Sequence, residues 1–211
     1  MLRLYSDQKI EKILNRYSRF AKTLSERYSV PVPFLFALLR QEMEGMDLLD
    51  PVADFVVRLN LGTLAKRYPD GALPVGHEKE SRYHPFRKTD SSTGYAQIYA
   101  FVGINALNFA VKEGLASYEQ FGLSADHTLQ PGNLRDLWTI WNRLNREPEF
   151  NMELATLNLL SAAKEKTGRI DFAGYSPEEI KRIYTRYNGT SSTITEYGES
   201  AYRHYLAYCG T

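Results

Sequence analysis

The sequence predicts an all-α fold, on the strength of three observations. Apolar side chains recur at helical spacing along most of the 211 residues, and the periodic stretches end at glycine or proline. Helix-capping residues precede several of them, most clearly the Ser176-Pro177-Glu178-Glu179 capping box. With 43% hydrophobic and 24% charged residues, the chain has the composition of an ordinary globular protein. We therefore expect a single domain over 1–211, with an N-terminal helix within 1–29 packed on the rest.

The first helix is expected to follow Ser6 and to continue to Tyr28, because apolar side chains recur there every three to four residues. Prolines on both sides of Val32 interrupt the helical pattern. Gly45 is expected to end the second helix, which begins near Pro33. Further helices are expected over 50–68, 94–114, 134–145, 148–168, 177–188 and 197–208, with a turn at 118–121.

The stretch Pro33 to Glu44, PFLFALLRQEME, combines a buried helix with charged residues at its end. Its six consecutive apolar residues, 34–39, leave no polar face, which is typical of a helix surrounded by protein. Carboxylates follow at Glu42 and Glu44, at the end where the helix dipole disfavours negative charge. A poorly solvated acid there should have a raised pKa. The alternative is that these side chains simply turn into water.

Residues 69–90 have no periodic pattern and contain three prolines and two glycines. We expect a long polar loop inserted in the helical domain. Loops of this length are usually functional or disordered.

Composition argues against several classes of protein. The formal net charge of +1 lacks the basic excess of a dedicated nucleic-acid binder. The uncharged run 91–111 contains Gln97 and two asparagines, which favours a buried helix over stable membrane insertion. A single cysteine and scattered histidines predict neither a metal site nor a cofactor; these residues are Cys209, His77, His84, His127 and His204.

Three short segments resemble, in their order, the lysozyme-like superfamily, especially lytic transglycosylases and goose-type lysozymes. They are LLRQE at 38–42, SSTGYAQI at 91–98, and RYNG at 186–189 followed by YG at 197–198. The resemblance extends over about residues 30–208 and is carried by about fifteen of them. It implies a lysozyme-like helical domain that cleaves the β-1,4 bond between N-acetylmuramic acid and N-acetylglucosamine.

Carried over residue by residue, the resemblance places the catalytic acid at Glu42, directly after Gln41. It assigns a substrate groove to two groups of residues, namely Gly94, Tyr95 and Gln97, and the later pair Tyr187 and Asn188. The sequence departs from the family at Met43, where a serine is usual, and in the shortened TGYAQI segment. The 55-residue gap between the acid and Gln97 is longer than in a minimal transglycosylase.

Asp90 is the candidate second carboxylate, because it immediately precedes the groove segment. Its alternative role is an Asx cap for the following helix. Glu44, Glu78 and Glu80 remain further candidates. The groove residues also have structural alternatives: a core aromatic for Tyr187, a helix stop for Asn188 and a backbone hydrogen bond for Gln97.

We expect peptidoglycan glycan strands as the substrate and a Glu general acid as the catalyst. The N-terminus has no apolar segment typical of a signal peptide. The expected enzyme is therefore an antibacterial effector delivered to the periplasm or cell wall of a target cell, with a cognate immunity protein as a partner. The alternatives are a phage-type endolysin, a chitin-cleaving enzyme, and a non-catalytic module that binds a glycan or a protein.

Overall fold

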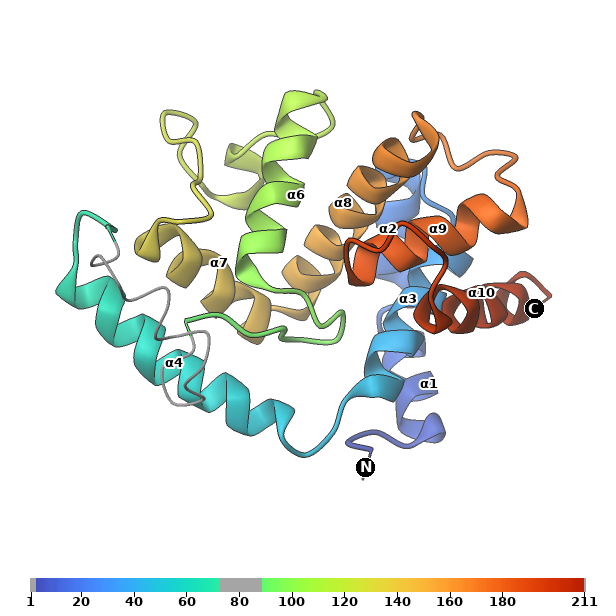
Figure 1. Ribbon diagram of the computed structural model, residues 1–211, viewed down its shortest axis with the longest axis horizontal. Coiled ribbons are helices and arrows are strands. Elements are labelled where there is room, and N and C mark those ends of the chain that lie inside the picture. The colour runs from blue at the N-terminus through green and yellow to red at the C-terminus, as the bar shows by residue number, and fades with distance from the viewer. Residues whose placement is uncertain (1–2, 73–88, 211) are drawn as a thin grey trace. The chain divides into compact units, whose positions relative to one another are not determined.

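The computed structural model describes residues 3–72 and 89–210, and these residues are mainly α-helical (Figure 1). The predicted all-α class is confirmed, whereas most of the loop expected over 69–90, with Glu78 and Glu80, lies outside the described residues. The helices are α1 (Asp7–Arg16), α2 (Ser18–Tyr28), α3 (Val32–Gly45), α4 (Asp50–Arg67), α6 (Ala100–Lys112), α7 (Leu134–Arg146), α8 (Pro148–Thr167), α9 (Pro177–Asn188) and α10 (Glu196–Cys209), with a short 3-10 helix, η2 (Glu119–Phe121).

The chain divides into two compact units, which are described separately. Unit 1 comprises Met1–Asp47 and Ala155–Thr211, and unit 2 comprises Leu48–Leu154. Helix α8 therefore begins in unit 2 and ends in unit 1. In the described part of the chain, none of the helices combines the length and the apolar character that a membrane crossing would require.

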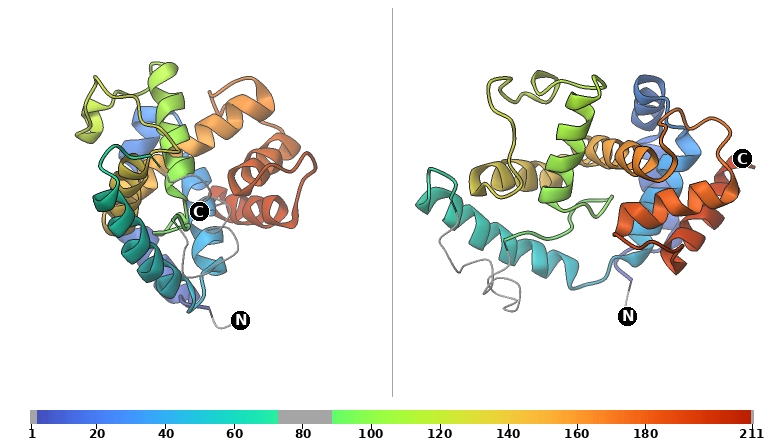
Figure 2. Two further views of the ribbon diagram at one scale, coloured as in Figure 1. Left: turned by 60° about the vertical axis from the view of Figure 1, so that its left-hand side comes forward. Right: turned by 45° about the horizontal axis from the view of Figure 1, so that its top comes forward.

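Helix α3 supplies the centre of unit 1. Five of the six residues in its apolar run are buried, as predicted; the exception, Phe36, is half-buried. The Phe34 ring lies 4.8 Å from Phe172 and 5.2 Å from Tyr184 between ring centroids, and the Tyr184 hydroxyl donates to the Phe34 carbonyl oxygen at 3.1 Å. Helices α1, α2 and α10 pack on α3, and α10 also lies alongside α9 (Figure 2).

The N-terminal segment forms two helices instead of the single predicted helix. α1 ends at Arg16 and α2 begins at Ser18, with Tyr17 between them at a non-helical ψ of 9°. The Ser18 hydroxyl donates to the Asn15 carbonyl oxygen at 2.8 Å, a local bond that competes with the regular helical pattern. Hydrophobic periodicity continues through such a break, so the sequence pattern does not show where one helix ends and the next begins.

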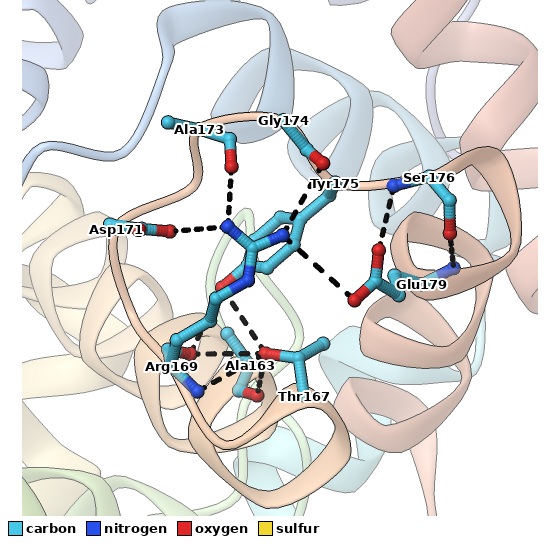
Figure 3. Close-up of polar contacts among 9 residues, drawn as sticks. All are labelled: Ala163, Thr167, Arg169, Asp171, Ala173, Gly174, Tyr175, Ser176 and Glu179. Atoms are coloured by element: carbon cyan, nitrogen blue, oxygen red, sulfur yellow. Dashed lines mark hydrogen bonds and ion pairs between the residues drawn. The ribbon is translucent and has the colours of Figure 1, made fainter.

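Side-chain contacts of Arg169 stabilise the loop between α8 and α9 (Figure 3). Its guanidinium donates to the carbonyl oxygens of Ala173 at 2.5 Å and Gly174 at 3.3 Å, and it pairs with Asp171 at 3.0 Å. It also lies 4.3 Å from the centroid of the Tyr175 ring. The Ser176 capping box then begins α9, as the sequence predicts.

In unit 2, α7 packs against both α4 and α6, and Trp141 of α7 is fully buried. A Cβ at Gly62 would lie 3.1 Å from the Trp138 ring, so this glycine allows α4 to approach α7 closely. The predicted start of this helix at Gly94 is wrong, because α6 begins at Ala100. Residues 93–98 instead form a turn closed by a β-bridge between Thr93 and Ile98.

The aromatic centre of unit 1 leads to a stability prediction. Replacing Phe34 with alanine should destabilise the protein by about 3–5 kcal/mol, because its ring contacts are lost and a cavity remains. The matched change Phe36→Ala, at a half-buried position of the same helix, should cost clearly less. Urea unfolding followed by circular dichroism measures both, and equal losses would contradict the central position of Phe34.

Candidate active site

Glu42 lies near the C-terminal end of α3 and is half-buried. The hydroxyl of Tyr197, in the first turn of α10, donates a short hydrogen bond to Glu42 Oε1. Both helices belong to unit 1 and pack against each other. From the sequence alone no role is assigned to Tyr197, although Tyr197-Gly198 belongs to the residues that carry the family resemblance.

A second tyrosine, Tyr187, brings the last turn of α9 into the surroundings of Glu42. Burial raises the pKa of Tyr187 well above its usual value of 10, and the charge of Glu42 raises it further. Burial and Glu42 raise the pKa of Tyr197 in the same way. Both phenols therefore stay protonated at neutral pH, so Tyr197 acts as a donor to the carboxylate. Asn188 is exposed as the last residue of α9.

Glu44, the other acid at this end of α3, pairs with Arg40 and lies beside His204. Its Oε1 accepts from Arg40 Nε at 2.7 Å, and its Oε2 lies 3.2 Å from His204 Nε2. Arg40 also pairs with Glu11 of α1. Burial lowers the pKa of His204, although the neighbouring Glu44 raises it. Glu42 and Glu44 thus have different partners: the hydroxyl of Tyr197 contacts the first, and Arg40 and His204 contact the second.

Asn151 of α8 holds the turn at 93–98 in unit 2. Its Nδ2 donates to the Thr93 carbonyl oxygen at 2.8 Å, and its Oδ1 accepts from the Ala96 amide at 2.9 Å. The Asn151 side chain is fully buried, and Gly94 packs against it with φ of +72°. A Cβ at Gly94 would lie 2.4 Å from Asn151 Nδ2, so this position requires glycine.

A polar cluster attaches the same segment to α4 and α7. Asp54 of α4 accepts from the hydroxyls of Ser91 at 3.0 Å and Thr93 at 2.8 Å. Asn145 of α7 donates to Asp54 at 2.9 Å and to Thr93 Oγ1 at 2.8 Å. Burial raises the pKa of Asp54 despite these hydrogen bonds. Sequence reasoning missed Asp54, Asn145 and Asn151, because single polar residues on helices carry no signal of their distant partners.

The predicted groove residues Gly94, Tyr95 and Gln97 all belong to this turn in unit 2. Gln97 adopts a positive φ of 43°, and its Nε2 donates to the Gly94 carbonyl oxygen at 2.9 Å. Its Oε1 accepts from the Ser92 hydroxyl at 3.1 Å. Gln97 thus makes the backbone hydrogen bond that was the structural alternative to its groove role. Tyr95, in the same turn, is half-buried.

Asp90 caps α6. Its two carboxylate oxygens accept from the backbone amides of Ala100 and Phe101, each at 3.0 Å. Burial raises the pKa of Asp90 to about 6, although the hydrogen bonds from these amides lower it. This geometry favours the helix cap, the alternative to a second catalytic carboxylate, and the capped helix begins six residues later than predicted.

Unit 1 therefore brings Glu42 together with Tyr187 and Tyr197, and unit 2 brings together Asp90 and the turn at 93–98. Among the residues described, no three His, Cys, Asp or Glu side chains gather as a metal site would require. Comparison with protein-family models, curated proteins and solved structures finds no match to this chain.

Gly94 provides a test of the turn geometry. Gly94→Ala should destabilise the protein by about 2–5 kcal/mol, because left-handed backbone strain adds to the clash with Asn151. Gly114 has a similar φ of +71° with open space around it, so Gly114→Ala should show the strain alone, about 1–2 kcal/mol. Chemical denaturation compares the two variants, and an equal cost would show that Asn151 does not restrict position 94.

The raised pKa of Asp90 predicts a pH dependence of stability. Because the folded protein holds this proton up to about pH 6 and the unfolded chain only to about pH 4, Asp90 makes stability fall as pH rises between them. The loss should reach about 2–4 kcal/mol. Unfolding measured from pH 4 to 7 should show a steeper fall for the wild type than for Asp90→Asn, which retains only the contribution of groups such as Asp54. Parallel profiles would mean that Asp90 titrates normally.

Proposed function

We propose that this protein is a peptidoglycan glycosidase with Glu42 as its general acid. The observation that carries the proposal is the environment of Glu42 in unit 1: a half-buried carboxyl group, hydrogen-bonded by Tyr197 and close to the buried Tyr187. General acids of glycosidases are carboxyl groups held in partly buried sites, and Glu42 occupies such a position. The ordered segments shared with lytic transglycosylases and goose-type lysozymes point to the same residue.

In the proposed reaction, Glu42 donates its proton to the glycosidic oxygen as the bond from that oxygen to C1 of N-acetylmuramic acid breaks. The departing N-acetylglucosamine leaves as an alcohol, and positive charge develops at C1. The Glu42 carboxylate then accepts the proton of the C6 hydroxyl of the same muramic acid, whose oxygen attacks C1. The product is a 1,6-anhydro ring, and Glu42 is protonated again.

The hydrogen bonds of Asp90 favour this transglycosylase route over hydrolysis. A hydrolase needs a second carboxylate to activate water or to stabilise the developing cation. Both oxygens of Asp90 are engaged at the N-terminus of α6, where they satisfy backbone amides. The intramolecular reaction requires only one acid, so we propose a lytic transglycosylase outcome.

The hydroxyl of Tyr197 fixes the orientation of the acid in this proposal. This hydrogen bond to Glu42 Oε1 limits rotation of the carboxyl group.

The direct test replaces Glu42 with glutamine, which keeps the size of the side chain and removes the acid. Release of soluble fragments from purified peptidoglycan should fall at least 10²–10⁴-fold, because general acid catalysis contributes about this factor. Circular dichroism and thermal unfolding should remain close to those of the wild type. Undiminished release by a folded Glu42→Gln protein would exclude this assignment, and no release by either protein would favour a binding module.

Tyr197→Phe tests the positioning role. Loss of one hydrogen bond to a charged group should reduce fragment release about 10–100-fold, mainly through kcat. Tyr202→Phe, on the same helix with its ring over Lys181, is the matched control and should retain activity. If both variants behave alike, Tyr197 has no special role.

A further inference from the structure

Gly198 lies in the first turn of α10, where this helix packs against α9 (Figure 2). A Cβ at this position would lie 2.2 Å from Thr185 Oγ1 and 2.5 Å from the Lys181 carbonyl oxygen, both on α9. These distances are far below ordinary van der Waals contact, and the carbonyl oxygen belongs to a helical backbone that yields little. Glycine therefore lets the two helices approach more closely than a residue with a side chain would.

The same threonine holds the residue that caps α10. Thr185 is buried, and its Oγ1 accepts from the Thr195 amide at 3.2 Å and from the Thr195 hydroxyl at 3.4 Å. Thr195 is the N-cap of α10, and its Oγ1 in turn accepts from the Gly198 amide at 3.4 Å. The start of α10 is thus fixed to α9 through the Thr185 side chain. We call Thr185, Thr195 and Gly198 the α9–α10 junction.

Tyr197 lies between the two α10 residues of the α9–α10 junction, and its hydroxyl contacts Glu42 on α3. The position of this hydroxyl therefore depends on where the first turn of α10 lies. A Cβ at Gly198 would have to move by about 1 Å to reach ordinary contact distance from α9. A displacement of this size takes a hydroxyl out of hydrogen-bond range of a carboxylate oxygen.

We propose, building on the proposed glycosidase function, that Thr185 and Gly198 are positioning residues that hold the Tyr197 hydroxyl on Glu42. Thr185 fixes the N-cap of α10, and Gly198 sets how closely the first turn approaches α9. Both act on the acid through Tyr197. Glycine is less favourable than alanine within a helix, so the close approach supplies the reason for a glycine in this turn.

Thr185→Val tests the first residue, because valine keeps the shape of threonine and removes the acceptor. Release of peptidoglycan fragments should fall about 10–100-fold, mainly through kcat, as for Tyr197→Phe. Thr185→Ser keeps the hydroxyl and should restore most of the release. Thr185→Val combined with Tyr197→Phe should be no slower than Tyr197→Phe alone, because both changes remove the same hydrogen bond. Losses that multiply would overturn the proposal, because Thr185 would then act independently of Tyr197.

Gly198→Ala tests the close approach, and Gly210→Ala is its matched control at the other end of α10. A Cβ at Gly210 has its nearest contacts at 3.9 Å, so this change should leave fragment release unchanged. Gly198→Ala should lower release about as much as Tyr197→Phe does. Equal release by the two folded alanine variants would contradict the positioning role of Gly198.

¹³C NMR of glutamate carboxyl groups tests the geometry without relying on activity, with the Glu42 resonance assigned through Glu42→Gln. Thr185→Val and Gly198→Ala should shift this resonance in the same direction as Tyr197→Phe, whereas Thr185→Ser and Gly210→Ala should leave it in place. An unmoved resonance in folded Thr185→Val and Gly198→Ala proteins would overturn the proposal. The expected shifts in a protein that releases no fragments would support the positioning and overturn only the glycosidase assignment.

Discussion

The apolar run of α3 is the constraint on which the proposed catalytic group depends. Because Phe34 to Leu39 have no polar face, the helix must be surrounded by protein, and α1, α2 and α10 provide that cover. The residues that follow the run are thereby held at the edge of the core. Glu42 is delivered to Tyr197 and Tyr187, while Glu44 meets Arg40 and His204. Two acids two residues apart thus have different hydrogen-bond and charge partners.

In unit 2, buried polar side chains position the turn at 93–98. The shape of the turn at 93–98 comes from buried hydrogen bonds to Asn151 and Asp54. Each of these side chains is satisfied at several atoms, as buried polar networks require.

Helix ends were predictable from this sequence where neighbouring residues determine them. The α9 capping box and the glycine at the end of α3 mark element ends within a few neighbouring residues. The break at Tyr17 and the late start of α6 were not predictable, since they follow from a side-chain bond of Ser18 and from the distant Asn151. The same limit applies to the candidate site. The apolar run indicated an acid near its end, and the family resemblance of Gln41-Glu42 selected Glu42 over Glu44. The contact between Glu42 and Tyr197, in contrast, joins residues 155 positions apart.

The proposal depends most on whether Glu42 cleaves glycan strands with a single acid, and mass spectrometry of digested peptidoglycan tests this directly. Wild-type protein should release fragments that end in 1,6-anhydro-N-acetylmuramic acid, and folded Glu42→Gln protein should release none. Fragments with reducing ends would contradict the single-acid route and indicate hydrolysis. Intact glycan strands after incubation with the wild type would contradict the enzymatic function itself.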